Sequence, residues 1–73
     1  MRNWLRDLRV KSNFTQKDVA ERVNLDVTAI SKYELGERRP SYETAKRVAS
    51  LLGFNWTRFF EDEETVGQVQ TGT

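Results

Sequence analysis

The sequence contains no cysteine and no histidine among its 73 residues. Disulfide bonds, thiolate nucleophiles and the usual zinc ligands are therefore excluded, and we expect neither a metal nor a cofactor. No apolar run approaches the length of a membrane span or of the hydrophobic part of a signal peptide. We expect a soluble, cytoplasmic protein with no membrane association and no evident small-molecule substrate.

The placement of the acidic residues argues against an enzyme. Without histidine and cysteine, catalysis needs carboxylates or lysines that converge in a cleft. The aspartates and glutamates are instead scattered along the chain or gathered in the run Glu61-Asp62-Glu63-Glu64. We therefore expect no catalytic residues.

Charge is distributed unevenly along the chain. Residues 1–60 hold all 12 lysines and arginines and 7 of the 11 acidic residues, a net charge of +5, whereas residues 61–64 carry −4. A basic body favours a polyanionic partner. The apolar pattern ends with this acidic run, so we predict one domain, residues 1–61, and an acidic, disordered C-terminal tail, residues 62–73.

Two short helical patterns lie between Gln16 and Tyr33, separated by only a few residues. In each of them, apolar residues recur three or four positions apart, which places them on one face of a helix. The segment between them has room only for a turn, and Asn24 within it tolerates a left-handed backbone. Helices joined so tightly cross steeply. The pattern predicts a helix-turn-helix whose second helix has the size to enter a major groove.

Three further helices are predicted around this unit, and no segment has the pattern of a strand. Glycines follow the third and fourth helices, where a left-handed residue ends a helix. We predict an all-α fold, a compact five-helix bundle that contains the helix-turn-helix. The predicted N-terminal caps of the five helices, in chain order, are Asn3, Thr15, Asp26, Ser41 and Asn55.

A series of short motifs is spaced along residues 5–60. They are Leu8-Arg9, Phe14-Thr15-Gln16, Val19-Ala20, Ile30-Ser31-Lys32-Tyr33-Glu34, Gly36, Arg39-Pro40-Ser41, Val48-Ala49 and Leu52-Gly53-Phe54. In their joint spacing they resemble the Xre-type helix-turn-helix domain of phage repressors and Cro proteins. The resemblance implies a five-helix DNA-binding domain that acts as a homodimer on a two-fold operator.

Four residues on the second helix of the unit are candidates for reading DNA bases. Thr28, Ser31 and Lys32 lie three and four positions apart and therefore share a face. The two hydroxyl groups suit base edges, and Lys32 suits guanine acceptors or a phosphate. Val27 suits contact with a thymine methyl group. The alternative for all four is an ordinary solvated helix face.

Phosphate contacts are predicted at the start of the second helix and in the loop before the fourth. The resemblance places a glutamine, here Gln16, against a backbone phosphate, and amides at a helix N-terminus favour such an anion. The alternative for each residue is a solvated surface position. The predicted phosphate-contacting residues are Thr15, Gln16, Lys17, Arg38 and Arg39.

Other side chains are predicted to hold the architecture. The resemblance implies a structural ion pair between Arg9 and Glu34 that fixes the pose of the recognition helix. Trp56, Phe59 and Phe60 crowd one short terminal helix beyond the needs of a small core, which predicts a dimer interface there. Core packing is the slightly favoured alternative for Phe59, and an interface is favoured for Trp56 or Phe60.

These features predict a sequence-specific DNA-binding transcriptional regulator, a small homodimeric repressor that reads a pseudo-palindromic operator through the major groove. Its partners are then double-stranded DNA and a second copy of the chain, with a regulatory protein as a further candidate. The alternative is a protein-interaction module of the same fold, of the antitoxin or coactivator type. The aromatic fifth helix and the acidic tail motivate this alternative.

Overall fold

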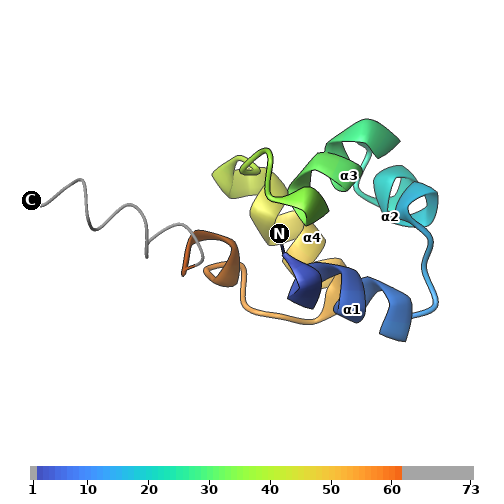
Figure 1. Cartoon of the computed structure of the whole chain (residues 1–73), viewed down its shortest axis with the longest axis horizontal. Coiled ribbons are helices and arrows are strands. Elements are labelled where there is room, and N and C mark those ends of the chain that lie inside the picture. The colour runs from blue at the N-terminus through green and yellow to red at the C-terminus, as the bar shows by residue number, and fades with distance from the viewer. Residues whose placement is uncertain (1, 62–73) are drawn as a thin grey trace, which may run out of the picture.

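The computed structural model describes residues 2–61, which form helices and the turns that join them. Helix α1 spans Asn3–Lys11, α2 spans Gln16–Arg22, α3 spans Val27–Leu35 and α4 spans Tyr42–Leu52. A fifth helical turn covers residues 58–61 (Figure 1). The predicted all-α, five-helix fold is confirmed. Met1 and the predicted tail, residues 62–73, lie outside the described residues.

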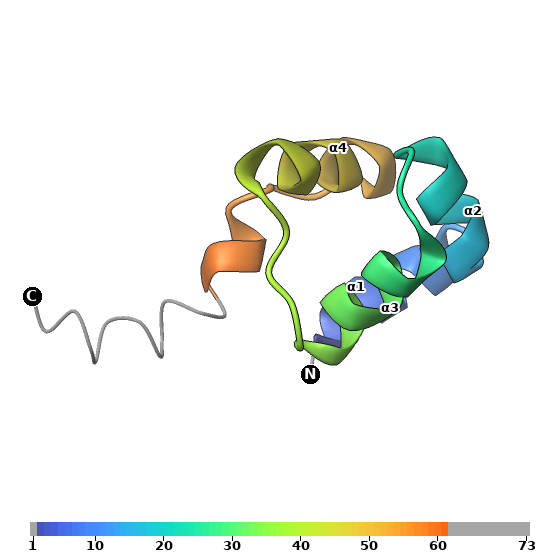
Figure 2. The ribbon, with the colours of Figure 1, turned by 90° about the horizontal axis from the view of Figure 1, so that it is seen from above.

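Helix α2 and the start of α3 lie at the end of the domain away from the fifth helical turn (Figure 1), whereas the last turn of α3 meets that turn through the rings of Tyr33 and Phe59. The fifth turn instead packs near the start of α4, as Figure 2 shows. Helix α1 packs against α3. Across residues 2–61, no helix has both the length and the apolar character that crossing a bilayer requires.

Four of the five predicted caps bond the first turn of their helices. Thr15 Oγ1 accepts a hydrogen bond from Asp18 N at 3.0 Å, and Asp18 Oδ2 accepts one from Thr15 N at 2.9 Å. These reciprocal bonds form the predicted capping box. Side-chain oxygens of Asp26, Ser41 and Asn55 accept from backbone amides two or three residues onward, at 3.0, 3.1 and 3.0 Å.

The start of α1 differs from the prediction. Asn3 lies inside the helix, and the capping position belongs to Arg2, which makes no side-chain cap. The Arg2 amide donates instead to Glu34 O at 2.8 Å, across the domain on α3. The predicted cap at Asn3 is therefore wrong, because a contact with α3 sets the beginning of this helix.

The turn of the helix-turn-helix is closed by backbone geometry. Asn24 has a φ of 59°, the left-handed conformation that the sequence predicts there. The Leu25 amide then donates to Ala20 O at 2.8 Å, which fixes the exit from α2. Gly36 and Gly53 adopt φ of 78° and 76° and end α3 and α4 in the same way.

The core lies between helices α1 to α4 and the fifth turn. Phe59 is fully buried, and its ring centroid lies 5.5 Å from those of Trp4 and Phe54 and 6.4 Å from that of Tyr33. The prediction that Phe59 forms part of a dimer interface is wrong, because its side chain closes one end of the core. The buried hydrophobic residues are Leu5, Val19, Ala20, Val23, Ala29, Ile30, Tyr33, Ala45, Val48, Ala49, Leu52 and Phe59.

Candidate nucleic-acid interface

Helix α3 has one buried face and one open face. Ala29, Ile30, Tyr33 and Glu34 are buried on the inner side. The four residues predicted to read bases lie on the other side: Val27 and Thr28 are exposed, and Ser31 and Lys32 are half-buried. None of these four side chains is enclosed in the core, so the first two turns of α3 present a hydroxyl and amine surface to the outside.

The beginning of α3 carries a carboxylate that is already engaged. Asp26 Oδ2 accepts a hydrogen bond from the Thr28 amide at 3.0 Å. A carboxylate suits this place because the exposed amides of a helix start carry partial positive charge. Asp26 is thus the cap of the helix, and its bond fixes the backbone of Thr28 beside it.

The inner side of α3 is tied to α1 and α2 by one buried network around Glu34. Arg9 Nε donates to Glu34 Oε2 at 2.6 Å, and Arg9 Nη2 donates to Glu34 Oε1 at 3.3 Å. Gln16 Nε2 donates to the same Oε1 at 3.0 Å. Arg9 Nη1 also donates to Phe14 O, in the loop before α2, at 2.9 Å. A single carboxylate therefore sets the positions of three helices relative to one another.

The Gln16 side chain is held at the start of α2 by its contact with Glu34. Its amide nitrogen carries two N–H groups, and one of them donates to Glu34 Oε1. The side chain is half-buried and sits at the first residue of α2. The contact with Glu34 holds the amide at a helix N-terminus, where backbone N–H groups favour an anion. The sequence pattern does not indicate this contact, because it depends on how α2 crosses α3.

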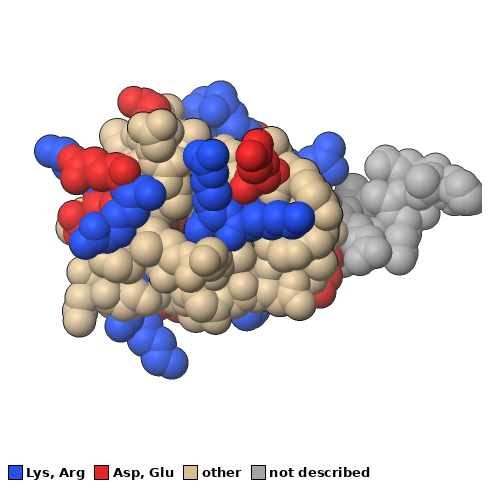
Figure 3. Space-filling model, turned by 180° about the vertical axis from the view of Figure 1, so that it is seen from behind, with Lys and Arg blue, Asp and Glu red and all other residues tan. Residues whose placement is uncertain are grey.

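The other residues predicted to contact phosphates lie at the surface. Thr15 and Lys17 are exposed at the start of α2, and Arg38 and Arg39 are exposed in the loop between α3 and α4. Basic and acidic side chains are interspersed on the face drawn in Figure 3. A broad basic surface does not cover that face, so attraction to a polyanion depends on where individual cations lie.

Arg2 is the residue of this region that the sequence pattern missed. Only 4% of its surface is exposed, although it is a charged residue next to the chain start. Arg2 Nη1 donates to Tyr33 O at 2.7 Å and to Arg38 O at 3.2 Å. No local sequence signal reports these bonds, because both acceptors are backbone carbonyls more than 30 positions away.

Three aromatic residues form an accessible cluster, here termed the aromatic surface: Tyr42, Trp56 and Phe60. Tyr42 is 58% exposed, and Trp56 and Phe60 are half-buried. The Trp56 ring lies edge-on to Tyr42 at 4.6 Å and to Phe60 at 5.8 Å. Lys46 Nζ lies 4.3 Å from the centre of the Tyr42 ring. Of the three aromatic residues predicted for an interface, Trp56 and Phe60 are therefore accessible and Phe59 is not. Tyr42 lies beside the accessible pair.

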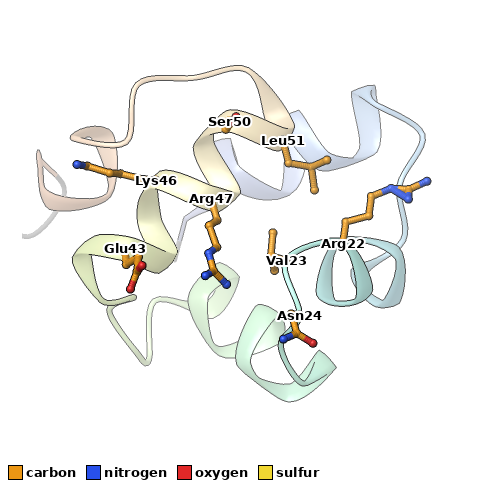
Figure 4. Close-up of a pocket in the computed structure, with 8 residues that line it drawn as sticks. All are labelled: Arg22, Val23, Asn24, Glu43, Lys46, Arg47, Ser50 and Leu51. Atoms are coloured by element: carbon orange, nitrogen blue, oxygen red, sulfur yellow. The ribbon is translucent and has the colours of Figure 1, made fainter.

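A shallow pocket lies between α4 and the turn that joins α2 to α3 (Figure 4). It contains none of the residues predicted to contact DNA. Among residues 2–61, no cluster of acidic side chains has the composition of a metal site. The pocket is lined by Arg22, Val23, Asn24, Glu43, Lys46, Arg47, Ser50 and Leu51.

The arrangement is that of a helix-turn-helix with an open second helix, and the comparison with known families agrees. The sequence profile of the helix-turn-helix family matches residues 5–59. The chain belongs to the Xre-type helix-turn-helix family of transcriptional regulators. Helix-turn-helix regulators bind DNA.

Three relatives are similar in sequence. The first is an uncharacterized HTH-type transcriptional regulator, YqaF, of Bacillus subtilis (strain 168), 40% identical over 62 residues, which are 85% of this chain and 82% of that protein. The cryptic phage CTXphi transcriptional repressor RstR of Vibrio cholerae is 31% identical over 84% of this chain and 55% of its own length. The HTH-type transcriptional activator BcrR of Enterococcus faecalis is 31% identical over 92% of this chain and 33% of its own length. No solved structure matches the chain.

Proposed function

We propose that the protein is a cytoplasmic, sequence-specific transcriptional regulator that reads its operator with the open face of α3. The observation that carries this proposal is the contrast between the two faces of that helix. Its inner face is buried and held by Glu34, while Thr28 is exposed and Ser31 and Lys32 are partly accessible. Val27, 42% exposed at the start of the helix, supplies an apolar contact for a thymine methyl group.

Phosphates on either side of the major groove are contacted by the residues that flank α3. Thr15, Gln16 and Lys17 supply these contacts from the start of α2, where the amides of the helix end add to the attraction. Arg38 and Arg39 supply them from the loop after α3. Such contacts position the protein and add little sequence information.

The regulator acts as a homodimer, and its aromatic surface supplies the contact between the two copies. Tyr42, Trp56 and Phe60 present rings beside each other, and exposed aromatic clusters of this kind mark interfaces. Two copies related by a two-fold axis place their α3 helices about 34 Å apart, one turn of DNA. The operator is then a pseudo-palindrome.

Repression is the simpler outcome for such a domain, because occupancy of the operator is enough to block transcription. The name of the relative RstR describes a phage repressor, and the similarity to it covers 84% of this chain. The similarity to the activator BcrR covers 92% of this chain but only 33% of BcrR, against 55% of RstR, so more of BcrR lies outside the shared domain and its activating function has room there.

The test begins with selection of bound sites from random DNA, followed by titrations on the selected site and on variants of it. Thr28→Ala and Lys32→Ala are expected to change the preferred bases, at about 1–3 kcal/mol per lost base contact. Arg38→Gln is expected to weaken binding to every site and leave the preference unchanged. Arg47→Ala, on α4 in the pocket, is the charge control. An unchanged preference after both α3 substitutions would sink the assignment of the reading face.

The aromatic surface also fits a second function, that of a protein-interaction module of the antitoxin or coactivator type. Gel filtration with and without DNA separates the two functions. A regulator forms a complex with DNA that weakens as salt rises, whereas a pure interaction module shows no salt-dependent shift. Trp56→Ala is expected to shift a dimer toward monomer in either case, so only the DNA arm discriminates.

A further inference from the structure

Arg2 joins the start of α1 to the last turn of α3 and to the loop that follows α3. Its backbone amide donates to Glu34 O at 2.8 Å, and its Nη1 donates to Tyr33 O at 2.7 Å. Both acceptors belong to the last turn of α3, where helix carbonyls lack partners within the helix and carry partial negative charge. A guanidinium at this end is therefore favoured both by hydrogen bonding and by the helix dipole.

The same nitrogen reaches the loop that follows α3. Arg2 Nη1 donates to Arg38 O at 3.2 Å, while the Arg38 side chain is exposed. Pro40, two residues further on, is buried and fixes the other end of this stretch. The guanidinium also lies 5.5 Å from the centre of the Phe59 ring, a cation–π contact that favours this position of the side chain.

We propose that Arg2 is a positioning residue for DNA binding: it holds the loop of residues 37–40 so that Arg38 and Arg39 face a phosphate. This inference rests on the proposed function, because it assigns a cause to two of the phosphate contacts named there. Arg2 itself is buried and does not contact DNA in this scheme. It orders the loop before DNA arrives, so less conformational freedom is lost on binding.

The experiment compares the full chain with Arg2→Met, Arg2→Lys and Arg6→Met. Arg6 is exposed one turn along α1, so its substitution removes the same charge without touching the loop. Anisotropy titrations on a selected operator and on random DNA are run at several salt concentrations, below the thermal midpoint of each variant. Binding constants are corrected for the folded fraction measured by circular dichroism.

Arg2→Met is expected to weaken binding to both DNAs by about tenfold, the equivalent of one charge-assisted hydrogen bond. The slope of log affinity against log salt is expected to fall by about 1, as for one lost phosphate contact. Arg2→Lys keeps the charge without the planar fork and is expected to fall between the wild type and Arg2→Met. Arg6→Met is expected to keep the wild-type slope.

A second readout needs no DNA. The heteronuclear NOE of the Arg38 and Arg39 amides reports the order of the loop in the free protein. It is expected to fall most in Arg2→Met, less in Arg2→Lys and not at all in Arg6→Met. Wild-type loop order together with a wild-type salt slope in both Arg2 variants would overturn the inference. Absence of salt-dependent DNA binding in the wild type would instead overturn the proposed function, and the loop readout would still decide what Arg2 holds.

Discussion

Replacing Glu34 with alanine removes the acceptor on which three helices converge. The carboxylate is 5% exposed and its partner Arg9 is 13% exposed, so solvent screens the pair weakly. Breaking one side of a buried ion pair costs about 3–5 kcal/mol, and the residual exposure of Arg9 favours the lower figure. The amide of Gln16 loses its acceptor as well. We expect a loss near 3 kcal/mol.

A loss of this size is large for so small a domain. Stability of about 0.05–0.15 kcal/mol per residue gives a domain of this length only a few kcal/mol in total. The urea midpoint of Glu34→Ala is expected to fall by about 2–3 M, at roughly 1 kcal/mol per molar urea. Tryptophan fluorescence follows the transition, because Trp4 packs against the core. Glu37→Ala, an exposed carboxylate just beyond α3, is the control and is expected to change stability by under about 0.5 kcal/mol.

A double-mutant cycle tests the cause of this loss. Arg9→Met combined with Glu34→Leu leaves no stranded charge, so the double variant is expected to be more stable than the sum of the single effects predicts, by about 1–3 kcal/mol. Additive effects would refute the account, because they would mean that the two charges contribute independently. A Glu34→Ala protein as stable as Glu37→Ala would refute it more directly.

Three smaller predictions concern individual positions. Two hydrogen bonds from Thr15 hold the pKa of the Asp18 carboxyl below its ordinary value. The ionised capping box therefore stabilises the folded state fully at pH values above the pKa of the unfolded chain. This contribution is lost as the pH falls through the lower pKa of the folded state. The stability difference between wild type and Asp18→Asn, followed by urea titration, is expected to shrink over that acidic range and not near neutral pH. Gly53→Ala is expected to cost only about 1–2 kcal/mol of backbone strain, since nothing lies within 4 Å of the added carbon; a larger loss in urea would contradict this. Phe59→Ala is expected to cost about 3–5 kcal/mol, and a thermal midpoint like that of wild type would contradict its place in the core.

Features with a local chemical signal could be predicted from the sequence. The capping box at Thr15 and the left-handed turn at Asn24 depend only on residues within a few positions. The open face of α3 follows from its helical period, which places Thr28 and Ser31 on a different face from the buried Ile30. These features follow the sequence because their hydrogen bonds and backbone angles form within one helix or turn. They do not depend on how the neighbouring helices pack.

Features that depend on distant packing could not be predicted in the same way. Phe59 and Phe60 are adjacent aromatics on a helical turn of four residues, too short for its period to identify the inward side. Only the position of that turn against α1 and α3 makes Phe59 the buried one. Arg2 is the extreme case, since its side chain donates to one carbonyl in the last turn of α3 and to another in the loop after that helix.

The contacts that hold α3 and the residues proposed to read DNA gather toward opposite ends of that helix, and Lys32 is the proposed reading residue nearest the held end. Arg2 and Glu34 act on its last turn, whereas Thr28 and Ser31 lie on its first two turns. A change at the held end moves the helix as a rigid rod relative to α1, so every base contact weakens together and the order of preference among sites is kept. A change at the reading end alters one contact and leaves the pose intact. Two measurements therefore distinguish substitutions at Glu34 from those at Thr28: the affinity for the best site and the ratio of affinities for two sites. A Glu34 variant is expected to lower the first and keep the second, whereas a Thr28 variant is expected to change the ratio. A Glu34 variant that changed the order of preference among sites would contradict this division.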